Sequence, residues 1–177
     1  KRRTWPKQGG KSPEGPVFLK EKDGTSMVEL KEAAAILKAS DHILILSHQY
    51  PDGDTLGSAA ALCRALQKLG KNARCECADE ICQKYRYLFQ GVKPQQFDPA
   101  LIVAVDVADK KLLGRLEGVY EGKIDLCIDH HGSHTEYAEY TYIDSTAAAT
   151  CEIIREVIQF LDVKIDTQIA ACIYTGI

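Results

Sequence analysis

The chain has 177 residues, of which 45% are hydrophobic, enough to bury the core of a single domain. It contains no run of eighteen or more apolar residues, so no transmembrane helix is expected. The formal net charge is −3, but residues 1–25 carry +4 and the remainder carries −7. An acidic body argues against a protein that binds long nucleic acids, which need many phosphate contacts.

The amino-terminal segment, residues 1–25, is rich in Gly, Pro and Lys and has little apolar periodicity. This composition predicts a disordered basic tail or an expression remnant. A sharper alternative is an arm that contacts nucleic acid, with Trp5 stacking on a base. The segment lacks the apolar region of a signal peptide, so a cytoplasmic protein is expected.

The seven cysteines lie mostly in apolar strand or helix patterns, which favours reduced, buried thiols. Cys75, Cys77 and Cys82 offer a weaker alternative, a cysteine-based metal or redox centre. Cys75 and Cys77 alternate along a predicted strand and share a face, and packing against a helix is the better explanation for both.

From residue 26 onward, nearly continuous apolar runs alternate with helical patterns. Strands are predicted at His42–Ser47, Ala73–Ala78, Leu101–Val105 and Ile124–Ile128, and Glu139–Ile143 alternates as a fifth strand would. The first predicted helix follows a capping box at Ser26–Glu29, and the last, Thr167–Tyr174, follows a cap at Asp166. Between them, helices are predicted at Thr55–Gly70, Asp79–Leu88, Lys110–Leu116 and Asp144–Phe160.

Strands that alternate with helices in this way are typical of an α/β fold whose parallel sheet is flanked by helices on both faces. The expected strand order is 2-1-3-4, with room for the fifth strand. Right-handed crossovers place all the carboxyl ends of such strands along one edge of the sheet. Ligands of open α/β sheets bind at that edge.

Chemically capable side chains follow the first predicted strand, within the stretch SHQYPDGDTLGS (Ser47–Ser58). His48, Asp52 and Asp54 are expected on the loop that leaves this strand. Pro51 fixes its own backbone, and Gly53 is expected to permit a tight turn that aims both carboxylates at one point. Imidazole nitrogen and carboxylate oxygen suit divalent ions such as Mn²⁺ or Mg²⁺.

Two further strand ends carry residues of the same kind. Asp106 follows the third strand, and Asp129, His130 and His131 end the fourth. Each alone has a structural explanation, such as a turn or a helix cap, but their convergence favours a shared metal site. His42 and His134 do not share the pattern and are left out of the predicted ligand set.

The number of ligands exceeds what one ion needs, which fits a centre of two metal ions bridged by a carboxylate such as Asp106. Such centres hydrolyse phosphoesters or phosphoanhydrides. Structural zinc is disfavoured because the cluster is rich in oxygen and contains no cysteine.

These segments resemble the DHH phosphoesterase superfamily. The resemblance rests on SHQYPDGDTLGS, VAVDVAD (Val103–Asp109) and IDHH (Ile128–His131), supported by DSTAAATCEII (Asp144–Ile154) and the terminal IYTGI, and it covers roughly residues 27–177. Within the superfamily the chain is most similar to the nanoRNase and pAp-phosphatase group. Cyclic di-nucleotide phosphodiesterases and family II inorganic pyrophosphatases are the neighbouring alternatives.

The resemblance implies two ions, Mn²⁺ with Mg²⁺ or Co²⁺ as alternatives. It places one ion at His48, Asp52 and Asp106, and the other at Asp54, Asp106 and His130. His131 would bind or protonate the substrate phosphate, and Asp129 would orient a histidine. Gly57 and Ser58 would allow close packing and carry no chemical role. The implied substrates are short RNA oligonucleotides or pAp, with no membrane partner and a homodimer left open.

The resemblance also implies a further metal-binding aspartate soon after a TGI-like segment, followed by a carboxyl-terminal DHHA1 domain. Neither occurs in the 177 residues, so residues 26–177 are expected to be a truncated catalytic domain with weak activity or none. A non-catalytic DHH module is the competing class, although every ligand expected before residue 177 is present.

Overall fold

The computed structural model describes residues 19–20 and 25–177. Nearly all of residues 1–25, including Trp5, therefore lie outside the described part, and the expectations for this segment stay untested.

One seven-stranded sheet organises the described chain, in the order β1-β2-β7-β6-β5-β3-β4. All neighbouring strands are parallel except β1 and β2. The predicted order is confirmed, since it corresponds to β4-β3-β5-β6, and the fifth strand is β7. The strands are β1 Leu19–Lys20, β2 Ser26–Met27, β3 Ile43–Ser47, β4 Ala73–Cys77, β5 Leu101–Val105, β6 Leu126–Asp129 and β7 Tyr140–Ile143.

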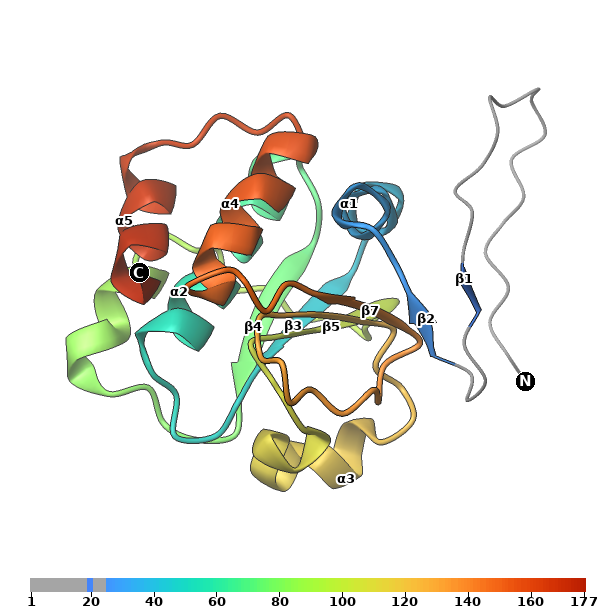
Figure 1. Ribbon diagram of the computed structural model, residues 1–177. Coiled ribbons are helices and arrows are strands. Elements are labelled where there is room, and N and C mark those ends of the chain that lie inside the picture. Colours follow the sequence, from blue (N-terminus) through green and yellow to red (C-terminus); the bar gives the residue numbers. More distant parts are fainter. Residues whose placement is uncertain (1–18, 21–24) are drawn as a thin grey trace.

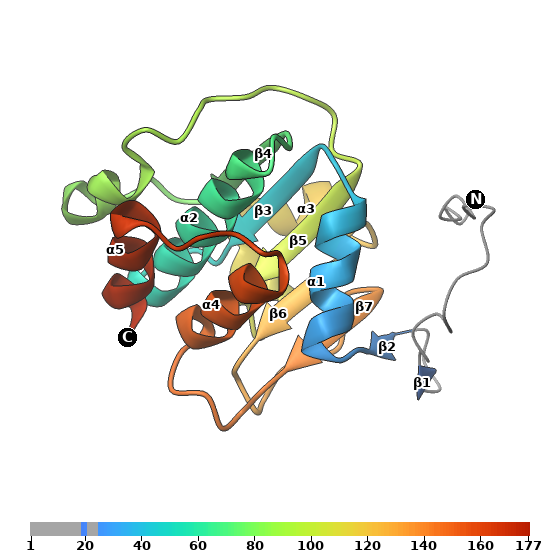
Figure 2. The same ribbon diagram turned by 90° about the horizontal axis from the view of Figure 1, so that it is seen from above.

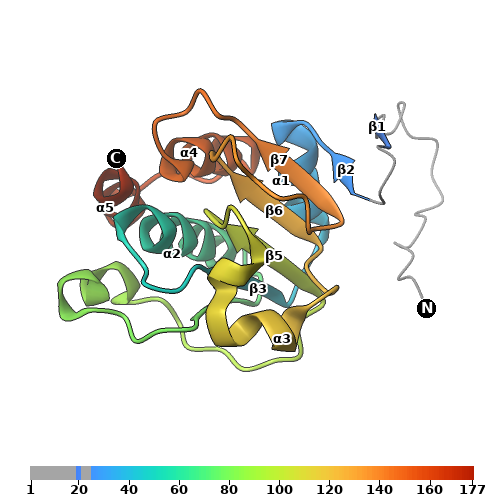
Figure 3. The same cartoon turned by 60° about the horizontal axis from the view of Figure 1, so that its bottom comes forward.

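Helices cover both faces of the sheet, but unequally (Figure 1). Four α-helices pack on one face, while a short 3-10 helix and a single turn of α-helix cover the other (Figure 3). The helical elements are α1 Leu30–Ala39, α2 Gly53–Lys68, η1 Gln83–Phe89, η2 Lys110–Leu116, α3 Glu117–Tyr120, α4 Thr150–Phe160 and α5 Thr167–Gly176.

The central strands are buried on both faces, which explains their continuous apolar sequences. In β3, Ile43 and Ile45 join the core beneath the four α-helices, whereas Leu44 and Leu46 join the core beneath η2 and α3. Figure 2, which views the molecule from above, shows α1, α2, α4 and α5 side by side over the strands. Because helices cover both faces of the sheet, a ligand can reach it at the edge formed by the carboxyl ends of the strands.

Three helices begin later in the chain than the sequence predicts. Ser26 lies in β2, and the capping box that begins α1 is instead formed by Glu29 and Glu32. Asp79 caps no helix, because its Oδ2 accepts a 2.7 Å hydrogen bond from the backbone of Tyr50, and η1 begins only at Gln83. Asp144 closes a local turn with Thr146, so α4 begins six residues later than expected, at Thr150.

The first helix after β3 begins earlier than predicted. Asp52 is the N-cap of α2 and accepts from the amides of Asp54 and Thr55, so Asp54 lies in the first helical turn rather than in a loop. Gly53 forms no tight turn. A Cβ at Gly53 would lie 2.5 Å from the carbonyl oxygen of Thr175, so this glycine permits α5 to approach. The tight backbone is at Tyr50, with φ of 53°.

The close approach of α2 and α5 continues one turn later. A Cβ at Gly57 would lie 2.5 Å from the carbonyl oxygen of Cys172 and 3.0 Å from Sγ of Cys151. The expectation that Gly57 serves packing is therefore confirmed. The contact holds the amino-terminal end of α2, with its carboxylates, against α4 and α5.

Within the described residues, no helix combines the length and the apolar character that a bilayer span requires.

Candidate metal centre

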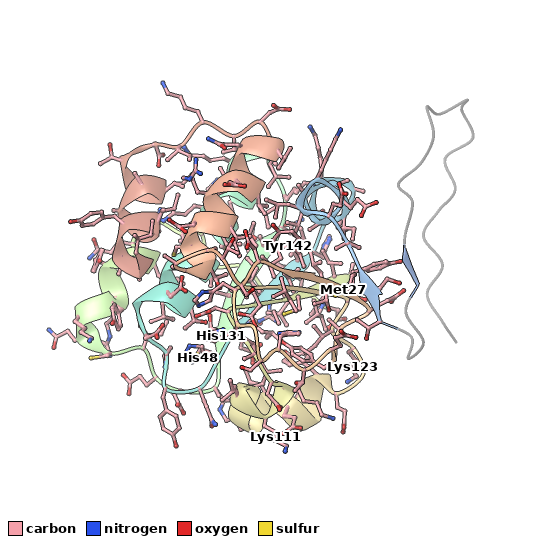
Figure 4. All side chains as sticks on the ribbon, viewed as in Figure 1. Met27, His48, Lys111, Lys123, His131 and Tyr142 are labelled. Carbon is pink, nitrogen blue, oxygen red and sulfur yellow. The ribbon has the colours of Figure 1, made fainter. Side chains whose placement is uncertain are left out.

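The predicted site residues gather at the carboxyl ends of three adjacent strands. His48 follows β3, Asp106 follows β5, and Asp129 ends β6 ahead of His130 and His131. Figure 4 shows the labelled side chains of His48 and His131 close together at this edge. The convergence expected from a parallel sheet is thus present in the structure.

Asp106 lies at the centre of the cluster, and its two oxygens face different histidines. Oδ2 is 3.7 Å from Nε2 of His48, and Oδ1 is 3.7 Å from Nε2 of His130. These distances are too long for hydrogen bonds. Asp106 is buried, and its φ of 58° is unusual for a residue other than glycine. Such backbone strain concentrates at functional sites.

The histidines present the same ring atom to the carboxylates. Nδ1 of His48 lies 2.7 Å from the carbonyl oxygen of Gln49, and Nδ1 of His130 lies 3.2 Å from that of Ala147. A carbonyl can only accept, so both Nδ1 atoms carry the hydrogen and each neutral ring keeps its lone pair on Nε2. The atom that could bind a cation therefore faces Asp106 in both residues.

The remaining carboxylates lie on the first turn of α2. Oδ1 of Asp52 is 3.8 Å from Nε2 of His48, and Oδ2 of Asp54 is 3.7 Å from Nε2 of His130. Thr55, on the same turn, donates to the carbonyl of Val105 and accepts from the amide of His48. This threonine therefore ties the β3 loop to the end of β5.

The amino terminus of α4 supports the cluster in a way that the sequence did not indicate. Both oxygens of Asp54 accept 2.8 Å hydrogen bonds from backbone amides, those of Thr150 and Cys151. The hydroxyl of Thr150 donates to Oδ1 of Asp106 at 2.9 Å, and the hydroxyl of Ser58 lies 3.3 Å from Oδ1 of Asp54. Ser58 thus contacts the site, contrary to its expected role in packing alone.

Asp129 is fully buried and binds the loop that follows it. Its Oδ1 accepts from the amides of His130 and His131 and from Nδ1 of His131, the last at 2.8 Å. Its Oδ2 accepts from Nδ1 of His134, also at 2.8 Å. His134, excluded by sequence reasoning, is therefore part of the site's support, and its side chain is only 1% exposed. The available signal was the Gly132-Ser133 turn, which returns the chain towards Asp129.

The electrostatics reflect crowded carboxylates. Burial and the nearby charge of Asp106 raise the pKa of Asp54 despite its backbone hydrogen bonds. Burial acts to lower the pKa of His48, but the carboxylate of Asp106 outweighs this effect and the pKa rises. The pKa of His131 rises in the same way, because the carboxylate of Asp129 outweighs the effect of burial. Burial also acts to raise the pKa of Asp129, yet hydrogen bonds from His134 and His131 lower it.

This geometry fits divalent cations. Ligand atoms of His48, Asp52 and Asp106 lie within 4.8 Å of one another, as do those of Asp106, His130 and His131. Asp106 belongs to both groups, as a bridging carboxylate would. A cation would also offset burial and the charge of Asp106, the two causes that raise the pKa of Asp54.

The second group differs from the set that the resemblance implies, because it contains His131 in place of Asp54. Nδ1 of His131 is already hydrogen-bonded to Asp129, whereas Nε2 of His130 directly faces Asp54. We therefore keep Asp54 as the candidate ligand and His131 as a residue for substrate.

Neither candidate metal group in the described residues contains a cysteine. The thiols of Cys75 and Cys77 lie 3.4 Å and 3.3 Å from the carbonyls of Ala59 and His48, and Cys82 is exposed. The alternative of a cysteine centre gains no support from this arrangement.

Several known proteins are similar to this chain in sequence or in fold. Residues 42–177 match the model of the DHH family, N-terminal domain. The chain is 32% identical to the bifunctional oligoribonuclease and PAP phosphatase NrnA of Thermus thermophilus, over 84% of this chain and 46% of that protein. It is 26% identical to the cyclic-di-AMP phosphodiesterase GdpP of Geobacillus thermodenitrificans, over 80% of this chain and 25% of that protein.

Among solved structures, the chain is similar to an exopolyphosphatase-related protein from Bacteroides fragilis, with a TM-score of 0.73 at 19% identity. This match covers 83% of the present chain and 48% of the other, and at such identity it shows a shared fold alone. The chain spans about half the length of the NrnA relatives it matches. Because the family model covers residues 42–177, the chain belongs to the DHH family.

Proposed function

We propose that this protein is a metal-dependent phosphoesterase that hydrolyses very short oligoribonucleotides to mononucleotides and also converts pAp to AMP. The observation that carries the proposal is the position of Asp106, whose two oxygens each face Nε2 of a different histidine. The likeness to NrnA proteins over most of the chain supports the choice of substrate.

In this proposal, His48, Asp52 and Asp106 hold one ion, and Asp54, Asp106 and His130 hold the other. Manganese is the expected metal, with magnesium or cobalt as alternatives. When bound, the two ions would stabilise charge on the phosphoryl oxygens and supply an activated water. The buried amides of Thr150 and Cys151 would keep Asp54 aligned throughout turnover.

His131 is the candidate catalytic residue that contacts substrate. Its side chain is 43% exposed, and Asp129 fixes its Nδ1 hydrogen, leaving Nε2 as the atom that can meet a phosphate. As an imidazolium it would bind a phosphate oxygen, and it could donate a proton to the leaving alkoxide. Asp129, whose side chain is fully buried, would act through His131.

The charge balance of the chain favours small substrates. Residues 26–177 carry a net formal charge of −7. A polymer held through many phosphates would be repelled by this body, whereas a substrate of two to five nucleotides could rely on the metal centre itself.

A substrate panel tests the proposal. Purified protein with Mn²⁺ would be given a labelled diribonucleotide, pAp, cyclic di-AMP and pyrophosphate, with Asp106→Asn as the control. We expect slow but measurable hydrolysis of the diribonucleotide and of pAp by the unaltered protein, and none by Asp106→Asn. Preferential cleavage of cyclic di-AMP would favour the second candidate, which the likeness to GdpP supports. Hydrolysis of pyrophosphate alone would rule out the nuclease assignment.

A calorimetric titration with Mn²⁺ separates the enzyme from a non-catalytic module of the same fold. A functional centre should take up the ion and lose this uptake in Asp106→Asn. A protein that binds no Mn²⁺ and cleaves none of the four compounds would support the non-catalytic class.

A further inference from the structure

His134 is a buried histidine for which the proposed mechanism has no direct use. Its side chain is 1% exposed, and its Nδ1 lies 2.8 Å from Oδ2 of Asp129. Its other ring nitrogen, Nε2, is buried and has no hydrogen-bond partner among the described residues. A buried polar ring is costly unless its hydrogen bonds are made, so the presence of this ring beside the site calls for a reason.

The surroundings fix this ring firmly. The ring of His134 packs against that of Tyr137, with centroids 5.1 Å apart. Tyr137 is itself anchored, because its hydroxyl donates to the carbonyl of Val107 at 2.7 Å. The amide of His134 donates to the carbonyl of His131, and the next residue, Thr135, bonds the carbonyl of Ala108. The position of Nδ1 is therefore set by packing and backbone contacts together.

The Asp129 carboxylate determines which nitrogen carries the hydrogen in the rings of His131 and His134. An ionised carboxylate can only accept hydrogen bonds, so Nδ1 of His131 and Nδ1 of His134 must both carry hydrogen. The lowered pKa of Asp129 agrees with an ionised group. His131 is then left, as a neutral ring, with its single lone pair on Nε2. His134 occupies the oxygen of Asp129 that His131 does not use.

We propose that His134 is a positioning residue, which holds the Asp129 carboxylate in the orientation that fixes the tautomer and ring position of His131. Removal of the Nδ1 donor would leave Oδ2 of Asp129 buried and unpaired. The carboxylate would then be free to turn, and its hydrogen bond with His131 would weaken. The effect on catalysis rests on the function proposed above, whereas the effect on the tautomer does not.

Two substitutions that resemble each other in shape test the proposal. His134→Asn carries an amide nitrogen at the same bond distance from the backbone as Nδ1, but it loses the ring atoms Cε1 and Nε2 and with them the ring packing against Tyr137. His134→Leu has nearly the same shape as the asparagine variant but no donor. His134→Gln places its amide one bond further out, near the position of Nε2, and serves as a polar variant should the leucine variant fail to fold.

The direct readout is the nitrogen NMR spectrum of the imidazoles, which is tractable because the chain has only five histidines. Without added metal, and at a pH at which the imidazoles are neutral, we expect His131 to carry its hydrogen on Nδ1 in the unaltered protein and in His134→Asn. In His134→Leu or His134→Gln, the alternative tautomer should become populated. Identical His131 spectra in all folded variants would overturn the proposal.

Turnover of a labelled diribonucleotide with Mn²⁺ gives the second readout. We expect kcat to fall about 10- to 100-fold in His134→Leu, with KM little changed, and to be restored to within about threefold by His134→Asn. Equal losses in the asparagine and leucine variants would show that the ring's bulk matters rather than its donor, and would also overturn the proposal. If neither the unaltered protein nor any variant cleaves the substrate, the proposed function is wrong. The NMR result would still decide the role of His134.

Discussion

The amide of Thr150 donates a 2.8 Å hydrogen bond to the carboxylate of Asp54, a residue 96 positions earlier in the chain. The bond joins the amino-terminal ends of α2 and α4 at the candidate metal centre. The first amides of a helix have no partners within it, and they carry the positive end of its dipole. The end of α4 therefore stabilises an anionic Asp54 that burial and Asp106 would otherwise disfavour.

The hydroxyl of Thr150 supplies the first prediction. In Thr150→Val, Asp106 loses a 2.9 Å hydrogen bond while the backbone bond to Asp54 remains. Because the lost bond goes to a buried carboxylate, we expect the free energy of unfolding to fall by about 1.5–3 kcal/mol. Turnover should fall about 10- to 100-fold as Asp106 loses its alignment.

Thr150→Ser is the matched control, since it keeps the hydroxyl and loses only a methyl group. Urea denaturation and diribonucleotide kinetics would be measured for both variants. If the serine variant lost as much activity as the valine variant, the hydroxyl would not be the group that matters.

The packing of α2 against α5 supplies the second prediction. In Gly57→Ala, the new Cβ would meet the backbone of α5 at Cys172 at 2.5 Å, so the helices must separate. We expect a loss of about 1–3 kcal/mol in the free energy of unfolding. The control is Gly118→Ala in α3, where a Cβ meets nothing within 4 Å and alanine should be neutral or slightly stabilising. Similar stabilities for the two variants in urea would contradict the close approach.

The cap of α5 supplies a prediction on pH. Hydrogen bonds from Lys68 and from the amide of Ile169 lower the pKa of Asp166 below its ordinary value of 3.8. A lowered pKa stabilises the fold above that ordinary value, and the contribution is lost as the pH falls below it. Asp166→Asn keeps a capping side chain but removes the charge, so this variant should be less stable than the unaltered protein at pH 7. Because the pair of Lys68 and Asp166 is partly exposed, we expect a loss of up to about 1 kcal/mol in the free energy of unfolding.

At pH 3 the same comparison should give a smaller difference. This pH lies below the ordinary pKa of 3.8, so Asp166 takes up a proton in the unfolded chain and part of the contribution is lost. Urea unfolding at low ionic strength at the two pH values measures this. A difference that did not shrink on acidification would show that the charge of Asp166 contributes nothing.

The sequence was sufficient for the five strands from β3 to β7 and for the residues at their carboxyl edge, but not for β1 and β2. β3, β5 and β6 have continuous apolar runs that end in His48, Asp106 and Asp129, and parallel strands bring such ends together. The cap at Asp166 was predictable for a related reason, since its partner, Ile169, is local in sequence.

Features that depend on distant partners were not predictable in this way. Asp144-Ser145-Thr146 has the composition of a helix start, but its hydrogen bonds close a turn, and the helix begins where Thr150 meets Asp54. Gly53 is explained by Thr175, far along the chain, rather than by a local turn. His134 was missed because its polar neighbours conceal that the chain folds back onto Asp129.

The central claim is that Asp106 bridges two cations, and anomalous diffraction from crystals soaked in Mn²⁺ tests it most directly. We predict two anomalous peaks about 3.5–4 Å apart, one on each side of the Asp106 carboxylate, and neither peak in Asp106→Asn. At saturating Mn²⁺, the absence of any peak beside Asp106, or peaks only at other surface carboxylates, would contradict the account.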